Sequence, residues 1–228
     1  MFQFDKNIEN SNSGVKMGFL IMSRVSSANP YKEEETAEFI SVLRNKFGRL
    51  DRKELKKLNP IGTYAAYYKK FGYSYPVLAQ LESVVQGKKS LDAESALLQV
   101  MFISELDSML LTAGHDLAEL QLPLLLKSAT GAESYQSISG KEVKTVNGDL
   151  MLCDSIGTIS SILRGPDYRS RITASTSDVL FSTYAPPGID ESYIKAHLEK
   201  LESRIKALSP SATTKLLQVF ITSNIPTG

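Results

Sequence analysis

Apolar positions in the first half of the chain recur every three or four residues, whereas in the second half they alternate or form short runs. The first spacing is typical of helices with one buried face, and the second is typical of strands. The expected helices cover 31–47, 51–58, 62–71 and 76–87, and glycines or a proline mark their ends. The segment 92–113 is apolar on almost all sides, which predicts a buried central helix.

The expected strands are short and lie mostly after that helix; they cover 14–22, 122–127, 142–146, 149–153, 156–163, 178–184 and 216–222. Asn147-Gly148 predicts a two-residue hairpin turn between the third and fourth of them. A polar loop is expected over 164–177. A last amphipathic helix is expected to be capped by Asp190; its inner face carries Ile194, Leu198, Leu201, Ile205 and Leu208.

This order of elements predicts the α+β class, with antiparallel or mixed sheets packed around the buried central helix and flanking helices. The chain shows no internal repeat and no linker rich in Pro, Gly or Ser. We therefore expect one domain over 1–228, in which a mostly helical half, 1–117, interleaves with a mostly stranded half, 118–228.

Composition indicates the cellular compartment of the protein and its relation to membranes. No apolar run approaches the ~20 residues of a membrane span, and the first ten residues lack the basic and apolar regions of a signal peptide. The one cysteine, Cys153, excludes an internal disulfide. These features favour a cytoplasmic protein that does not enter a membrane.

Several kinds of chemistry have no support. The two histidines, His115 and His197, form no cluster with cysteine or carboxylates at metal-ligand spacing, so we expect no metal and no cofactor. Cys153 follows an apolar run, where a small buried side chain is the usual interpretation. Neither a Gly-rich phosphate loop nor a nucleophile elbow is present.

Two polar segments remain as candidate site residues. The first, 112–116, is either the C-terminal cap of the buried helix or part of a site that contains His115. The second, 164–171, holds three arginines, an acid and a tyrosine, which suit either a solvated turn or the rim of a pocket for a polar ligand.

The net charge of +1 means that any contact with nucleic acid has to be local, and we expect no DNA binding. Basic residues gather in two places, which are either solvated helix faces or phosphate contacts. The first group is Lys46, Arg49, Arg52, Lys53, Lys56 and Lys57; the second is Lys69, Lys70, Lys88 and Lys89.

The stretch 59–117 contains an aromatic-basic segment, a helix led by Pro76, a Gly87-Lys88-Lys89 turn and an apolar helix that breaks at 114–116. This order resembles the B3/4 domain of the phenylalanyl-tRNA synthetase beta chain, and more closely the stand-alone proteins that consist of that domain. The run ITASTSDVLF at 172–181 is similar to the family's I-T-x-x-T-x-x-V-L-L pattern. The resemblance spans roughly Phe2 to Phe220.

In the synthetase this domain is the editing module. An apolar phenylalanine pocket discriminates against the added hydroxyl of tyrosine by only ~10²-fold, so mischarged tRNA is hydrolysed at a second site with the help of a histidine and a glutamate. Here Ala113 stands where the family has the histidine, with His115 two positions later. Tyr168, next to Asp167, stands where the glutamate is expected. Tyrosine-specific editing is therefore not predicted for this chain.

The resemblance implies that this chain binds tRNA or aminoacyl-tRNA, and that it hydrolyses a misacylated ester in trans if other side chains fill the two roles. In that pocket His115 would orient water, Asp167 would bind the substrate ammonium, and Arg169 or Arg171 would hold the terminal phosphate. Further pocket residues would be Thr112, Asp116, Arg164, Tyr168 and Thr173. On the RNA-binding face, phosphate contacts would come from Lys69, Lys70, Lys88 and Lys89, with Tyr67 or Phe71 stacking on a base.

The alternative is a small-molecule or protein-binding module on the same fold, which the near-neutral charge favours. A chain of this length has no room for an adenylate-forming synthetase core, so it is not a complete synthetase. The sequence does not predict the amino acid, the tRNA or the oligomeric state.

Overall fold

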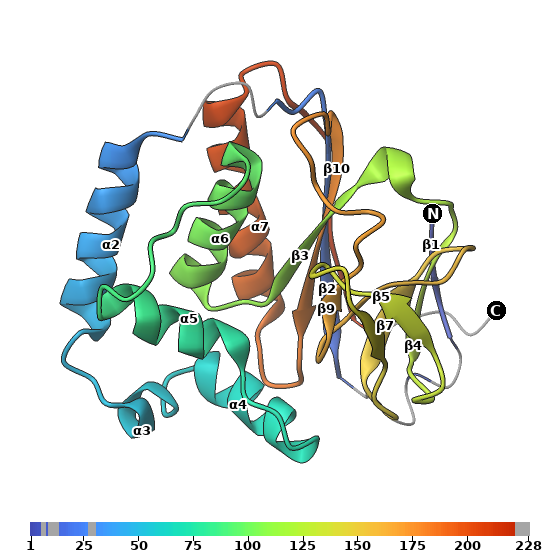
Figure 1. Cartoon of the computed structure of the whole chain (residues 1–228), viewed down its shortest axis with the longest axis horizontal. Helices are drawn as coiled ribbons and strands as arrows, with labels where there is room; N and C mark the ends of the chain where they lie inside the picture. Colours follow the sequence, from blue (N-terminus) through green and yellow to red (C-terminus); the bar gives the residue numbers. More distant parts are fainter. Residues whose placement is uncertain (6–7, 9–13, 27–30, 222–228) are drawn as a thin grey trace.

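Helices α6 (Ala96–Ser108) and α7 (Glu191–Leu208) cover one face of a four-stranded sheet, and a five-stranded sheet covers the other face (Figure 1). The structure is a computed structural model that describes residues 1–5, 8, 14–26 and 31–221. The class is α+β, which confirms the prediction from the order of the elements. Among the described residues, no helix is long and apolar enough to cross a bilayer.

The remaining helices form a layer at the side of α6. They are α2 (Glu33–Phe47), α3 (Arg52–Leu55), α4 (Ile61–Lys70) and α5 (Pro76–Val85). The short 3-10 helix η1 (Leu117–Glu119) is the exception: it follows β3 and lies away from this layer (Figure 1). Pro76 is the first residue of α5, as its fixed φ favours. Asp51 caps α3 through a reciprocal pair of hydrogen bonds with Glu54.

The four-stranded sheet is antiparallel, and its strands in spatial order are β11 (Thr213–Ile221), β2 (Lys16–Ser23), β10 (Asp178–Ala185) and β3 (Thr112–Asp116). The five-stranded sheet is mixed; in order it holds β1 (Phe2–Phe4), β4 (Leu124–Ser128), β7 (Leu150–Cys153), β8 (Thr158–Ser161) and β9 (Gly165–Pro166). Strands β5 (Ser134–Gln136) and β6 (Glu142–Lys144) form a separate pair.

The predicted central helix is shorter than its apolar pattern. It ends where Met109 adopts a left-handed φ of 56°, and 112–116 forms the edge strand β3 instead of the helix end or turn that the pattern favoured. Pairing with β10 supplies the backbone hydrogen bonds of this segment. Gly114 allows the close approach, because a Cβ there would lie 2.6 Å from Ile172 Cδ1 and 3.0 Å from Met101 Sδ.

The predicted hairpin around Asn147-Gly148 is also wrong in its pairing. Gly148 has the positive φ of a turn, but β6 pairs with β5, while β7 pairs with β4 and β8. The expected polar loop 164–177 contains β9, and sequence reasoning missed β1 and β5. The last predicted strand ends at Thr222, which lies outside the described residues.

Four buried tyrosines attach α4 and α5 to the rest of the protein. Each hydroxyl donates to a distant acceptor: Tyr64 to the Tyr184 carbonyl, Tyr67 to the Asp149 carboxylate (2.9 Å), Tyr68 to the Ile162 carbonyl (2.6 Å) and Tyr75 to the Met109 carbonyl (2.7 Å). A buried tyrosine needs such a partner. The aromatic segment is therefore part of the core.

Candidate functional site

Strand β3 directs His115 towards the five-stranded sheet. His115 lies opposite Leu180 in β10, so these side chains share a face with Tyr184, whose hydroxyl meets Ser160 of β8. Thr112 projects from the opposite face, where its hydroxyl lies 3.0 Å from His197 Nε2 on α7. Thr112 therefore does not join His115, although both are in the predicted pocket.

The two candidate segments lie side by side. The Asp116 amide donates to the Ser170 carbonyl at 2.7 Å, and His115 forms an isolated bridge with Arg171. Asp167 is held in the same region because its amide donates to the Ile159 carbonyl of β8 at 2.7 Å. Tertiary pairing thus brings together residues that are about fifty positions apart in the sequence.

Hydrogen bonds link three of these side chains in a row. We call this row, which consists of His115, Ser170 and Asp167, the His115 centre. His115 Nδ1 lies 2.7 Å from Ser170 Oγ, and the Ser170 hydroxyl donates to the Asp167 carboxylate. Asp167 Oδ1 is 3.8 Å from His115 Nδ1, so the serine mediates the link between them. His115 Nε2 has no hydrogen-bond partner among the described residues. His115 is fully buried and Asp167 is 4% exposed, so substrate has no direct access to the centre in this conformation.

Burial and Arg169 set the charges of this centre. Desolvation, and after it the nearby Arg169, lower the pKa of His115 to about 3, so the imidazole is neutral at pH 7. Desolvation also raises the pKa of Asp167. The Arg169 guanidinium lies 3.7 Å from Asp167 and 2.8 Å from the buried carboxylate of Asp154, and it also donates to the Glu119 carbonyl. Arg169 is therefore committed within the protein and poorly placed to hold a terminal phosphate.

Asp116 and Thr173 belong to the frame of the site. One oxygen of Asp116 accepts from the Ala118 amide (3.0 Å), and the other accepts from the Thr176 hydroxyl (2.7 Å). The Thr176 hydroxyl also receives the Thr173 amide at 2.9 Å. These bonds fix the loop that enters β10.

Three other predicted residues lie at the surface, at two different places. Arg171 stacks over the Tyr168 ring at 3.7 Å, and Tyr168 is 37% exposed. Arg164 lies in the turn between β8 and β9, before the segment that holds Tyr168 and Arg171. There it stacks over Tyr73 at 5.0 Å and donates to the Lys144 carbonyl at 3.0 Å. The expected arginine rim is thus divided: Arg169 and Arg171 lie beside the His115 centre, and Arg164 lies apart from it.

The predicted RNA-binding residues also lie at different places in the structure, and some of them are buried. Tyr67 is 5% exposed and bonded to Asp149, so its ring is not available to stack on a base. Phe71 is partly buried and packs on Tyr67 with a centroid separation of 5.3 Å. Lys69 and Lys70 are exposed at the end of α4, whereas Lys88 and Lys89 lie beyond the far end of α5, a helix about 15 Å long.

One group of cations and aromatic rings is compact, and we call it the cationic corner: Lys69, Lys70, Phe71, Tyr73, Lys144 and Arg164. Phe71 lies against Gly148, and Arg164 joins Tyr73 to the backbone of β6. None of its four cations forms an ion pair with a carboxylate of the described residues. Sequence reasoning named Lys69, Lys70 and Phe71 as RNA-binding residues and Arg164 as a pocket residue, and it missed Tyr73 and Lys144.

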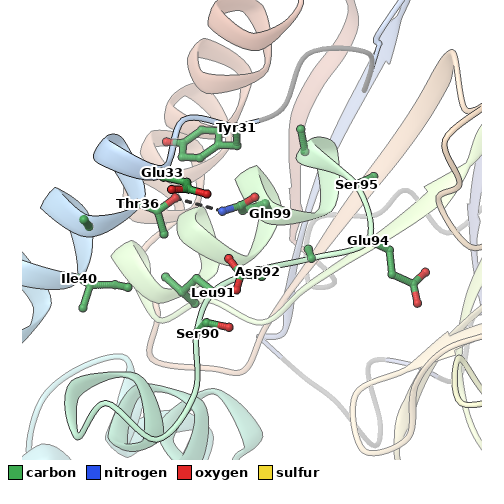
Figure 2. Close-up of a pocket in the computed structure, with 13 residues that line it drawn as sticks. Tyr31, Glu33, Thr36, Ile40, Ser90, Leu91, Asp92, Glu94, Ser95 and Gln99 are labelled. Atoms are coloured by element: carbon green, nitrogen blue, oxygen red, sulfur yellow. Dashed lines mark hydrogen bonds between the residues drawn. The ribbon is translucent and has the colours of Figure 1, made fainter.

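A cavity of about 550 Å³ lies between α2 and the segment that leads into α6 (Figure 2). Glu33 and Asp92 supply carboxylates at its wall, Tyr31 supplies a ring, and no lysine or arginine lines it; the Glu94 side chain points away from it (Figure 2). Carboxylates repel phosphate, so this cavity is unsuited to RNA. No sequence motif pointed to it. In the part of the chain that the structure describes, no three His, Cys, Asp or Glu side chains are grouped to hold a metal ion.

The contact between Glu105 of α6 and the first residue of β3 can be tested through the pH dependence of protein stability. Its side chain accepts from the Thr112 amide at 3.0 Å, and burial raises its pKa to about 8. The folded protein therefore keeps a proton that the unfolded chain releases near 4.5, and this contribution to stability is lost as pH rises through 8. The free energy of unfolding should fall by about 1 kcal/mol between pH 7 and 9 from this group. Urea denaturation of Glu105→Gln should lack that fall; an identical fall in both proteins would contradict the assignment.

Comparison with known proteins yields one similarity in structure. No family model and no curated protein matches the chain. Among solved structures, an N-terminal fragment of the phenylalanyl-tRNA synthetase beta-subunit from Pyrococcus horikoshii is similar, with a TM-score of 0.47 and 10% identity. The match covers 94% of this chain and 50% of that fragment, so the chain spans about half its length. A likeness of this size carries no argument about activity.

Proposed function

We propose that the protein binds tRNA or aminoacyl-tRNA, and that the His115 centre hydrolyses the ester of a misacylated tRNA in trans. The observation that carries the proposal is the cationic corner, which combines two aromatic rings with four cations that form no ion pair with a carboxylate of the described residues. Cations that follow the backbone and rings that stack on bases are the combination by which proteins bind single-stranded RNA. The sequence resemblance described above supports the choice of tRNA.

Hydrolysis would need neither a metal nor a covalent enzyme intermediate. A water oxygen attacks the ester carbonyl carbon, and the bond from that carbon to the ribose oxygen breaks. The water proton passes through His115 Nε2 to the departing ribose oxygen, which leaves free amino acid and tRNA. Because His115 is fully buried, the protein has to open around Nε2 to admit the ester while Asp167 and Ser170 keep their contacts with His115.

Replacing Lys69 and Lys70 together by alanine tests the binding step. Each lost phosphate contact should lower the slope of log affinity against log salt by roughly one. We expect filter binding to show weaker affinity by a similar factor for every tRNA, because phosphate contacts carry no base information.

The matched control is the double replacement of Lys56 and Lys57, an exposed lysine pair outside the corner that removes the same charge. Equal losses in both double variants would show that overall charge, and not the corner, governs binding. A wild-type protein without affinity for tRNA at low salt would refute the proposal.

The acid-lined cavity supports a second candidate function, binding of a small cationic ligand. A volume of about 550 Å³ lies within the ~300–1,000 Å³ of small-molecule sites. Its partly apolar wall, with Ile40 and Leu91, would bury the ligand body, and the carboxylates would meet its charge. Absence of tRNA binding in the filter assay would leave this as the supported function.

A further inference from the structure

We propose that Ser170 is a positioning residue that fixes the tautomer of His115, with the proton on Nδ1 and a bare lone pair on Nε2. The inference concerns the protein alone and holds whatever its ligand is. Only its consequence for hydrolysis rests on the proposed function. Ser170 is fully buried and was not among the residues that sequence reasoning selected.

The carboxylate of Asp167 ends the row of hydrogen bonds that starts at His115. Arg169 lies 3.7 Å from Asp167 Oδ2, and the Ser170 amide approaches both carboxylate oxygens at 3.3 and 3.4 Å. Burial raises the pKa of Asp167, whereas the Ser170 bonds and the Arg169 charge act in the opposite direction and favour the ionised form. An ionised carboxylate can only accept, so the single Ser170 hydroxyl proton points to Asp167.

The direction of the next bond follows. Because its proton is committed to Asp167, Ser170 Oγ can only accept from His115 Nδ1, 2.7 Å away. A neutral imidazole carries one N–H, so the proton is on Nδ1 and Nε2 is an acceptor. Nε2 is buried and has no partner among the described residues, and a buried acceptor without a donor is costly.

This state selects the kind of group that His115 can bind. Nε2 takes a hydrogen-bond donor and rejects an acceptor such as a carbonyl oxygen. A neutral donor, water or a hydroxyl, suits it better than an ammonium ion, which would lose its hydration at a fully buried site. In the proposed hydrolysis, that donor is the attacking water.

The second histidine is an internal reference. His197 is also buried, but both of its ring nitrogens have partners: Nδ1 lies 2.9 Å from Ser108 Oγ, and Nε2 lies 3.0 Å from Thr112 Oγ1. Ser108→Ala is therefore the counterpart of Ser170→Ala, made beside the other imidazole.

Nitrogen NMR of the ¹⁵N-labelled wild-type protein at pH 7 tests the proposal without RNA. With two histidines in the chain, His115→Gln assigns the signals. We expect a pyrrole-type Nδ1 and a pyridine-type Nε2 for His115. The opposite assignment would overturn the proposal, since it would place the hydroxyl proton on the histidine side. This measurement needs no variant at Ser170.

Ser170→Ala should shift the tautomer ratio of His115 by about tenfold, the equivalent of one hydrogen bond. Ser170→Thr should restore it, and Ser108→Ala should leave His115 unchanged. An unchanged ratio in a folded Ser170→Ala protein would mean that Asp167 acts on the ring directly, and would refute the role of Ser170. Loss of tRNA binding would leave these spectra unaffected, so failure of the proposed function is separable from failure of this inference.

Discussion

Replacing His115 or Asp167 by alanine is expected to slow the release of amino acid from mischarged tRNA by at least about a hundredfold. That is the lower end of what a positioned acid–base group contributes. The reason is structural: Asp167 holds Ser170, Ser170 holds His115, and His115 Nε2 is the acceptor that the water requires. The measurement is release of radiolabelled amino acid from a panel of mischarged tRNAs, with folding checked by circular dichroism.

Three controls define this result. Deacylation should persist in EDTA, because no step of the proposed hydrolysis uses a metal. It should also persist in Cys153→Ala, because burial raises the pKa of the thiol and no step uses that thiol. His197→Gln changes a buried histidine on the other face of the sheet and should retain activity. Release that continues at the wild-type rate in both alanine variants would exclude the His115 centre as the catalytic site.

Asp149→Ala is expected to destabilise the protein by about 3 kcal/mol or more. Its carboxylate accepts from the Tyr67 hydroxyl and the Leu150 amide, both at 2.9 Å, and from the Leu163 amide at 3.0 Å. Removing it leaves two buried donors and one partly buried donor without that partner, at about 1–3 kcal/mol each where nothing replaces it. Urea denaturation measures the change.

Tyr67→Phe is the milder companion, because it deletes one donor and keeps the ring. We expect a loss of about 1–2 kcal/mol with tRNA affinity unchanged. Phe71→Leu should instead weaken tRNA binding, since Phe71 belongs to the cationic corner. Weaker tRNA binding in a stable Tyr67→Phe protein would contradict the assignment of Tyr67 to the core.

The sequence alone determined the α+β class and most of the elements. Local signals suffice where the pattern and the environment agree: Pro76 opens α5, and the spacing from Ile194 to Leu208 predicts α7. His115 also stood out at the break after the apolar helix, and Asp167 stood out as the acid among the three arginines of 164–171. That the chain forms a single domain stays a prediction.

Only the tertiary structure decided what those residues contact. Met109 to Ala113 is apolar enough to continue a helix, but pairing with β10 makes 112–116 a strand. Tyr67 looks like a surface ring in an aromatic-basic run until Asp149, 82 positions away, receives its hydroxyl. Ser170 carries no signal in the sequence, because its role comes from standing between two side chains that the folded sheets bring together. Local pattern sets which elements form, whereas long-range pairing and burial set which polar groups meet.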